Sequence, residues 1–172
     1  MSKFNDVLGA VYRKEVETLR QLTREDMNLR DKDGRIPLMH AVLAEDADPA
    51  IVKLLIERGA DVNAADEQKW TALHFAAQDQ KAVMVRVLLE AGAAADALDR
   101  FGDTPLWRAM RKTANLEVIR ELLARGADPL KKNIHGVAPI DLARTFGRDD
   151  LVALFKSKGV AAELRRDATD SN

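Results

Sequence analysis

Four segments of the chain share one pattern of apolar and polar positions, and each ends at a glycine. They are IVKLLIERGAD (51–61), MVRVLLEAGAA (84–94), VIRELLARGAD (118–128) and LVALFKSKGVA (151–161). In the first segment, Ile51, Leu54 and Leu55 fall on one face of a helix. The glycines suit the left-handed position that follows a helix C-terminus; they are Gly59, Gly92, Gly126 and Gly159. The pattern therefore predicts four amphipathic helices, each stopped by a glycine.

A second phrase precedes each of these segments. The four copies are DGRIPLMHA (33–41), QKWTALHFA (68–76), FGDTPLWRA (101–109) and HGVAPIDLA (135–143). In the third copy, Thr104 can cap a helix N-terminus, and Pro105 suits the first helical position. The threonine position recurs at spacings of 35, 33 and 34 residues, at Ile36, Thr71, Thr104 and Ala138. We therefore expect a repeating unit of helix, short turn, helix and extended loop.

Neither helix of such a unit can bury its apolar stripe alone, so neighbouring units must stack and share one continuous core. The last unit carries Lys156 where the other units carry Ile56, Leu89 and Leu123. Its outer side can therefore meet water, as expected of a unit that caps a stack.

These phrases resemble the ankyrin repeat, in which T-P-L-H-x-A is followed by a leucine-rich helix and G-A-D. The resemblance implies an all-α fold with short β-hairpin-like loops, a solenoid of stacked helix–turn–helix units. We expect a single domain over 1–162 and a polar tail over 163–172. Within the domain we expect a capping unit at 4–28 and four repeats at about 29–61, 62–94, 95–128 and 129–160. A chain that is nearly all repeat also resembles small bacterial single-domain ankyrin proteins.

Composition narrows the class of protein. The 172 residues are 47% hydrophobic and 32% charged, with a net charge of −1 and no cysteine. This charge balance gives no pull toward nucleic acid or acidic membranes, and thiol chemistry is excluded. The first 20 residues lack the apolar core of a secretory signal, and no segment has the apolar length of a membrane span. We therefore expect a cytoplasmic protein that is monomeric and binds neither nucleic acid nor membranes.

Candidate chemistry is sparse. The three histidines, His40, His74 and His135, lie in different units, with no carboxylate at catalytic or ligand spacing. The acidic pairs Asp46–Asp48 and Asp149–Asp150 lack the spread of ligands that a calcium loop needs. No phosphate-binding loop or nucleophile elbow appears. We expect no catalysis, no metal and no cofactor. The family resemblance implies instead that His74 makes a hydrogen bond between adjacent loops.

By the same resemblance, the residues around each loop tip and at the end of each first helix face a partner. From these we select as partner-binding residues Arg35, Trp70, Gln78, Arg100, Phe101, Asp103, Arg111, Lys112 and His135. Trp70 and Phe101 are expected to face water and to act as interface hot spots. The alternative is that these two rings fold back onto a neighbouring tip. Trp107 is expected to pack rather than to bind.

Basic residues gather on the third and fourth units, at Arg100, Arg108, Arg111, Lys112, Lys131 and Lys132. They form either a solvated charged face or a surface for a partner with acidic groups, where complementary charge raises the association rate and specificity. The sequence thus favours a non-catalytic module that binds another protein through the concave face of the stack. The alternatives are an immunity protein that neutralises a toxin, and a regulatory subunit or an enzyme with an unrecognised site.

Overall fold

The computed structural model describes residues 3–111 and 114–157. An N-terminal unit contains α1 (Lys3–Tyr12), α2 (Val16–Gln21) and α3 (Arg24–Met27). Helix pairs follow: α4 (Pro37–Leu43) with α5 (Pro49–Glu57), α6 (Ala72–Gln78) with α7 (Ala82–Glu90), and α8 (Pro105–Ala109) with α9 (Leu116–Ala124). The last pair joins α10 (Pro139–Thr145) to a helix over residues 149–157.

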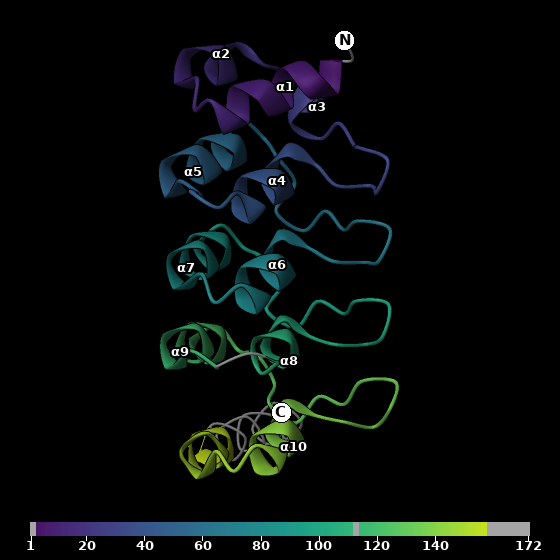
Figure 1. Ribbon diagram of the computed structural model, residues 1–172, viewed down its shortest axis with the longest axis vertical. Coiled ribbons are helices and arrows are strands. Elements are labelled where there is room, and N and C mark those ends of the chain that lie inside the picture. Colours follow the sequence, from purple (N-terminus) through teal and green to yellow (C-terminus); the bar gives the residue numbers. More distant parts are fainter. Residues whose placement is uncertain (1–2, 112–113, 158–172) are drawn as a thin grey trace, which may run out of the picture.

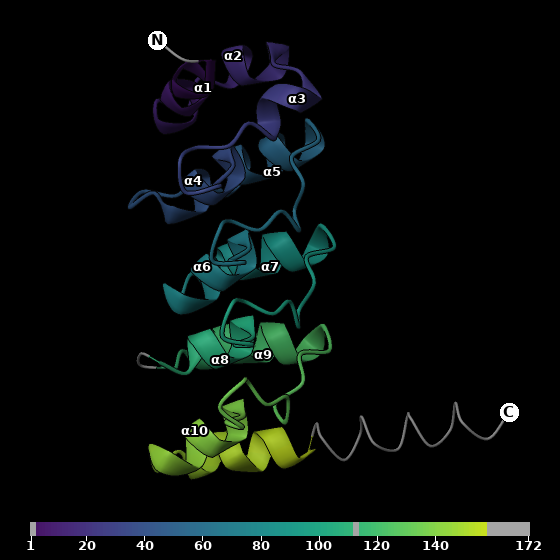
Figure 2. The ribbon, with the colours of Figure 1, turned by 90° about the vertical axis from the view of Figure 1, so that its right-hand side faces the viewer.

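The pairs stack in one direction as two columns of helices (Figure 1). An inner column holds α4, α6, α8 and α10, and an outer column holds α5, α7, α9 and the helix over 149–157. The N-terminal unit closes one end of the stack, since α1 packs on α4 and α2 packs on α5. Seen from the side, each pair forms a separate layer (Figure 2). The predicted all-α solenoid of stacked helix–turn–helix units is therefore confirmed.

Four loops project from the stack on the same side (Figure 1). We call them fingers; they comprise residues 28–36, 61–71, 94–104 and 128–138. Each finger leads into the inner helix of one pair, and finger and pair together are numbered as repeats one to four. We call the surface formed by the finger tips and inner helices the inner face, and that formed by the outer helices the outer face. The described residues contain no β-strand, only an isolated antiparallel bridge between Ala65 and Thr71.

Local chemistry sets the helix ends as the sequence predicts. The Thr104 side chain caps α8 by accepting a hydrogen bond from the Trp107 N–H at 3.2 Å, and Pro105 occupies the first turn. After the outer helices, Gly59 and Gly126 have φ values of 96° and 89°, in the left-handed region that favours glycine. Gly159, predicted to play the same part, lies outside the described residues.

One buried apolar cluster runs through all four repeats, because each layer covers the apolar side of the next. Leu55, Leu88 and Leu122 are fully buried at equivalent positions of successive outer helices, and Phe155 continues the series in the last repeat. Lys156 is exposed where Leu89 is buried, so the last repeat turns a polar position to water, as its sequence predicts.

Candidate functional site

Each finger is folded by one polar side chain that binds the main chain ahead of it. In the second finger, Asp66 Oδ1 accepts hydrogen bonds from the N–H groups of Gln68 and Trp70, both at 2.8 Å. The equivalent residues of the other fingers make the same two contacts; they are Asp31, Asp99 and Asn133. Each turn also places one residue in the left-handed region, a glycine in three fingers and Lys69 (φ 60°) in the second. The tip conformation is therefore set within each finger.

Main-chain hydrogen bonds join the four finger tips into one row. Three N–H groups each donate to a carbonyl oxygen of the preceding tip at 3.0 Å: Glu67 to Asp33, Arg100 to Gln68, and Ile134 to Phe101. Backbone hydrogen bonds thus help to hold the spacing of neighbouring finger tips. A partner would meet a surface that is already formed.

A second set of contacts joins the repeats at the finger bases. Asn28 donates from Nδ2 to the Gly59 carbonyl oxygen at 2.9 Å, and its Oδ1 accepts from the Asp61 N–H at 2.8 Å. Asn63 makes the same two contacts with the third repeat. Asp96 occupies the equivalent position in the third finger. Its carboxylate accepts a hydrogen bond from the Asp128 N–H of the fourth finger, but it has no N–H to donate in return. Burial raises the pKa of Asp96 above its usual value.

The third finger holds a buried cluster of charged groups. Arg108 is buried, its Nε donates to Asp99 Oδ2 at 2.9 Å, and its Nη2 lies 3.0 Å from Asp103 Oδ2. Asn133 of the next finger donates to Asp103 Oδ1 at 2.7 Å. Burial raises the pKa of Asp103, against the opposing effects of Asn133 and Arg108. The expectations that Asp103 faces a partner and that Arg108 belongs to a surface cluster are therefore wrong, because both side chains are buried and pair with each other inside the repeat.

Trp70 is the anchor of this cluster on the inner face. The Arg108 guanidinium lies 4.5 Å from the centre of the Trp70 ring, at cation–π distance. The ring centre of Phe75 in α6 lies 5.0 Å from that of Trp70. Trp70 is consequently half-buried against the core and does not stand free in water as expected. The alternative, a ring folded back onto a neighbouring tip, differs from the structure as well, because Trp70 packs on Arg108 of α8 and Phe75 of α6.

The same contacts continue in both directions as a row of guanidinium groups and rings. The Arg35 guanidinium lies 5.3 Å from the Phe75 ring in the second repeat. Beyond Arg108, Trp107 lies 5.4 Å from that guanidinium and 5.9 Å from the guanidinium of Arg111. Trp107 is half-buried, which confirms that it packs. The row ties the first, second and third repeats together along the inner face and ends at Arg111, which is exposed.

His74 makes the contact between loops that the family resemblance implies. Its Nδ1 accepts from the Thr71 N–H at 3.1 Å, and its Nε2 lies 3.2 Å from the Asp103 carbonyl oxygen in the third finger. Burial lowers the pKa of His74 to about 4, so the ring is neutral at pH 7. This histidine is therefore a structural link between repeats.

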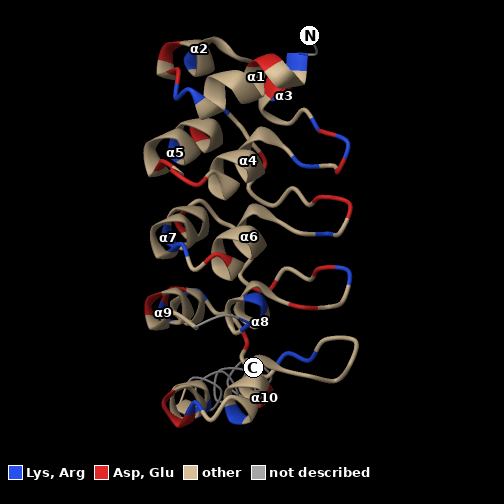
Figure 3. Cartoon of the chain, viewed as in Figure 1, with Lys and Arg blue, Asp and Glu red and all other residues tan. Residues whose placement is uncertain are grey.

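The other selected residues differ in accessibility. Arg100, Phe101, Arg111 and His135 are exposed, whereas Arg35 and Gln78 are half-buried; Lys112 lies outside the described residues. Phe101 keeps 48% of its surface in water, which confirms the expected exposure of this ring. In the coloured cartoon, basic positions lie on the third and fourth fingers, with acidic positions beside them on the third (Figure 3).

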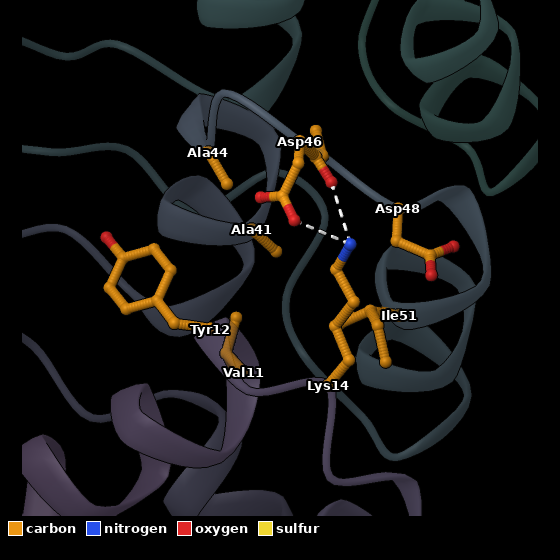
Figure 4. Close-up of a pocket in the computed structure, with 9 residues that line it drawn as sticks. Val11, Tyr12, Lys14, Ala41, Ala44, Asp46, Asp48 and Ile51 are labelled. Carbon is orange, nitrogen blue, oxygen red and sulfur yellow. Dashed lines mark hydrogen bonds and ion pairs between the residues drawn. The ribbon is translucent and has the colours of Figure 1, made fainter.

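A small hollow lies between the N-terminal unit and the first repeat (Figure 4). Lys14 Nζ spans it, 2.7 Å from the Asp46 carboxylate and 3.1 Å from the Asp46 carbonyl oxygen. Asp48 caps α5 through the Ala50 N–H at 2.8 Å. The hollow has a volume of ≈ 10 Å³, about enough for one water molecule. It therefore joins two units and offers no space for a ligand, and the Asp46–Asp48 pair serves a salt bridge and a helix start.

In residues 3–111 and 114–157, no three side chains of the metal-binding types converge. Over the same residues, no helix combines the length and the apolar character that crossing a bilayer requires.

The geometry agrees with comparison to known proteins. A family model described as ankyrin repeats (3 copies) matches residues 7–99 and, in a second register, residues 42–133. The chain belongs to the ankyrin-repeat family. It is 38% identical to inversin of Gallus gallus over 98% of this chain and 12% of inversin. It is 34% identical to the tyrosine-protein kinase Shark of Drosophila melanogaster, over 72% of this chain and 13% of the kinase.

A viral relative is similar over most of this chain. The putative ankyrin repeat protein FPV031 of fowlpox virus is 28% identical over 88% of this chain and 46% of the viral protein. The chain thus spans less than half the length of each of these three relatives. Ankyrin repeats generally mediate protein–protein interaction and are typically non-catalytic.

One exposed residue of these ankyrin fingers was not selected from the sequence. Ile134 occupies the tip position of the fourth finger that Arg100 occupies in the third, and 66% of its surface is exposed. The signal that could have selected it is its alignment with Arg100 next to the tip turn. A preference for charged and aromatic residues passed over an aliphatic one.

Proposed function

We propose that this chain is a non-catalytic ankyrin-repeat protein that binds another protein on its inner face. The observation that carries the proposal is the row of finger tips, joined by three main-chain hydrogen bonds of 3.0 Å. Because these tips are linked before binding, little conformational entropy is lost when a partner docks. A scaffold and an inhibitor would both be served by such a surface.

The side chains on this surface suit a protein partner. Phe101 offers an exposed ring, Arg111 ends the row of guanidinium groups and rings, and Arg100 and Lys132 are exposed on the third and fourth fingers. Interfaces between proteins are enriched in aromatic residues and arginine, which supply most of the binding energy. The basic residues favour a partner with acidic groups opposite repeats three and four.

The test is affinity capture from native lysate with three forms of the chain. These are the wild type, an inner-face variant (Phe101→Ala/Arg111→Ala) and an outer-face control (Lys53→Ala/Val83→Ala). All four positions are exposed, so the variants are expected to fold, and circular dichroism checks this. We expect the wild type and the control to recover the same protein and the inner-face variant to recover about tenfold less. Equal recovery by the inner-face variant, or loss with the outer-face control, would contradict the proposal.

A further inference from the structure

Two residues with exposed apolar side chains are neighbours at the tips of the third and fourth fingers. The Ile134 N–H donates to the Phe101 carbonyl oxygen at 3.0 Å, which fixes the two residues side by side. A Cβ atom added to Gly102 would lie 3.4 Å from Ile134 Cγ2, so the isoleucine side chain rests on the tip turn of the third finger. Phe101 and Ile134 are 48% and 66% exposed. The two residues form an apolar patch that water covers in the free chain.

The charges around this patch have one sign. Within the third and fourth fingers, the exposed charged side chains are Arg100 and Lys132. The acidic residues of these two fingers are less accessible: Asp99 and Asp103 are buried and paired with Arg108, and Asp96 and Asp128 are half-buried at the finger bases.

The first and second fingers differ. There, exposed acidic residues stand beside exposed basic ones, with Asp33 near Lys32 and Glu67 near Lys69. Because Asp99 and Asp103 are buried with Arg108, Arg100 is the one exposed charged residue of the third finger, although the finger contains more acidic than basic residues.

We infer that the third and fourth finger tips bind an acidic segment of a partner protein, with an apolar side chain of that segment packed on Phe101 and Ile134. This inference rests on the proposed function and names the chemistry of the partner. An apolar centre with a charged rim is the usual anatomy of a protein interface. Carboxylates of the segment meet Arg100 and Lys132 at that rim, where complementary charge selects the partner and speeds its association.

A nucleic acid fits this patch poorly. Binding a phosphate backbone needs a continuous basic stripe, and these two fingers expose one cation each, next in sequence to apolar or uncharged residues. A second copy of the chain is another occupant to test, because Glu45 and Asp46 of its first repeat are exposed acidic residues that would offer carboxylates to the patch. The experiment below distinguishes it.

The probe is a random 12-residue peptide library displayed on phage and selected on the full chain. We expect the enriched peptides to carry net negative charge and at least one aromatic or large aliphatic residue. The affinity of a synthesised peptide is then measured by fluorescence anisotropy. The variant Phe101→Ala/Ile134→Ala should bind about tenfold more weakly, and Arg100→Glu/Lys132→Glu should also bind about tenfold more weakly.

The matched control is Lys32→Glu/Lys69→Glu, which changes the net charge by the same amount on the first and second tips. At 0.15 M salt the Debye length is about 8 Å, so charges on other fingers act weakly, and the control should bind within about twofold of the wild type. All six substituted residues are exposed, and thermal unfolding verifies that the four-repeat stack is intact in each variant.

Several results would overturn the inference. Enriched peptides without acidic residues, or equal weakening by the Lys32→Glu/Lys69→Glu control, would do so. If only Arg111→Ala weakens peptide binding, the inference is wrong but the proposed function still stands. Enriched peptides whose binding is weakened only by the outer-face variant Lys53→Ala/Val83→Ala would contradict both proposals. No enrichment at all would overturn the inference, and the capture experiment would still test the proposed function. Self-association in sedimentation that Arg100→Glu/Lys132→Glu abolishes would show that the occupant is a second copy.

Discussion

His74 Nε2 lies 3.2 Å from the carbonyl oxygen of Asp103, a residue of the next repeat. Both groups are buried, and the other ring nitrogen of His74 accepts from the Thr71 N–H. These partners require a neutral ring with its proton on Nε2. The His74 ring thus binds the N-terminus of its own helix, α6, and also contacts the third finger. Its protonation state is therefore coupled to the stability of the stack.

The first prediction is a loss of stability on mild acidification. Burial holds the pKa of His74 at about 4, against about 6.5 in the unfolded chain. Above pH 6.5 the ring is neutral in both states, and the neutral, buried His74 contributes its full amount to stability. Below pH 6.5 the unfolded state binds a proton that the folded state does not, so this stabilising contribution is lost as the pH falls from 6.5 to 4. The full loss is on the order of 3 kcal/mol.

The measurement is urea unfolding of the wild type and His74→Asn at pH 7.5, 6, 5 and 4.5. The asparagine variant controls for carboxylates that titrate in the same range, since it retains all of them. We expect the stability gap between the two proteins to narrow steadily as the pH falls. A gap that stays constant over this range would show that His74 is not held neutral by burial.

Asp96→Asn should stabilise the chain by about 1 kcal/mol at pH 7. An asparagine there can donate to the Gly126 carbonyl as Asn28 donates to Gly59, and it removes a carboxylate whose pKa burial raises. The reciprocal change, Asn63→Asp, should destabilise by a similar amount. Urea unfolding of the two variants checks both signs. A stabilised Asn63→Asp protein would mean that the base contacts do not control stability.

Arg108→Ala should destabilise the chain by about 3–5 kcal/mol, because Asp99 and Asp103 are left buried without their cation. In an Asp103→Asn background the same change should be less severe, since one buried carboxylate is gone. A double-mutant cycle from urea unfolding measures this coupling. Strictly additive effects would indicate that the guanidinium acts through its packing on Trp70 rather than through its charge.

Gly102→Ala should destabilise by about 1–2 kcal/mol. Its φ of 72° disfavours a side chain, and an added Cβ would lie 3.2 Å from the Ile134 N atom. The opposite change, Lys69→Gly, removes the cost of holding a lysine in the left-handed region but makes the unfolded chain more flexible. The net effect should be a folded state that is more stable by about 0.5 kcal/mol. Thermal unfolding of both variants tests the pair. A more stable Gly102→Ala protein would contradict the tip geometry.

The helices and fingers could be predicted because their causes are local. Thr104 and Pro105 start α8 by interactions within one turn, and Gly59 ends a helix by its own conformational freedom. The repetition of these signals at a constant spacing predicts the stack, since no single unit can cover its apolar side.

The accessibility of the site residues could not be predicted, because its causes lie in different repeats. Trp70 is half-buried because Arg108, 38 positions further along the chain, packs on its ring. Asp103 is buried because the next finger brings Asn133 to its carboxyl group. Phe101 keeps 48% of its surface exposed, as expected. Pattern and spacing locate the tips, and contacts between repeats decide which side chains remain available.

Alkylation of single cysteines, introduced into a chain that has none, tests the inner-face account most directly. His135→Cys and Gln68→Cys place a thiol on exposed finger tips, and Val83→Cys places one on exposed α7 of the outer face. The rate of maleimide labelling is measured with and without the protein recovered by capture. The account predicts slowed labelling of at least one tip cysteine and an unchanged rate at position 83. Unchanged rates at both tips with protection at position 83 would contradict it.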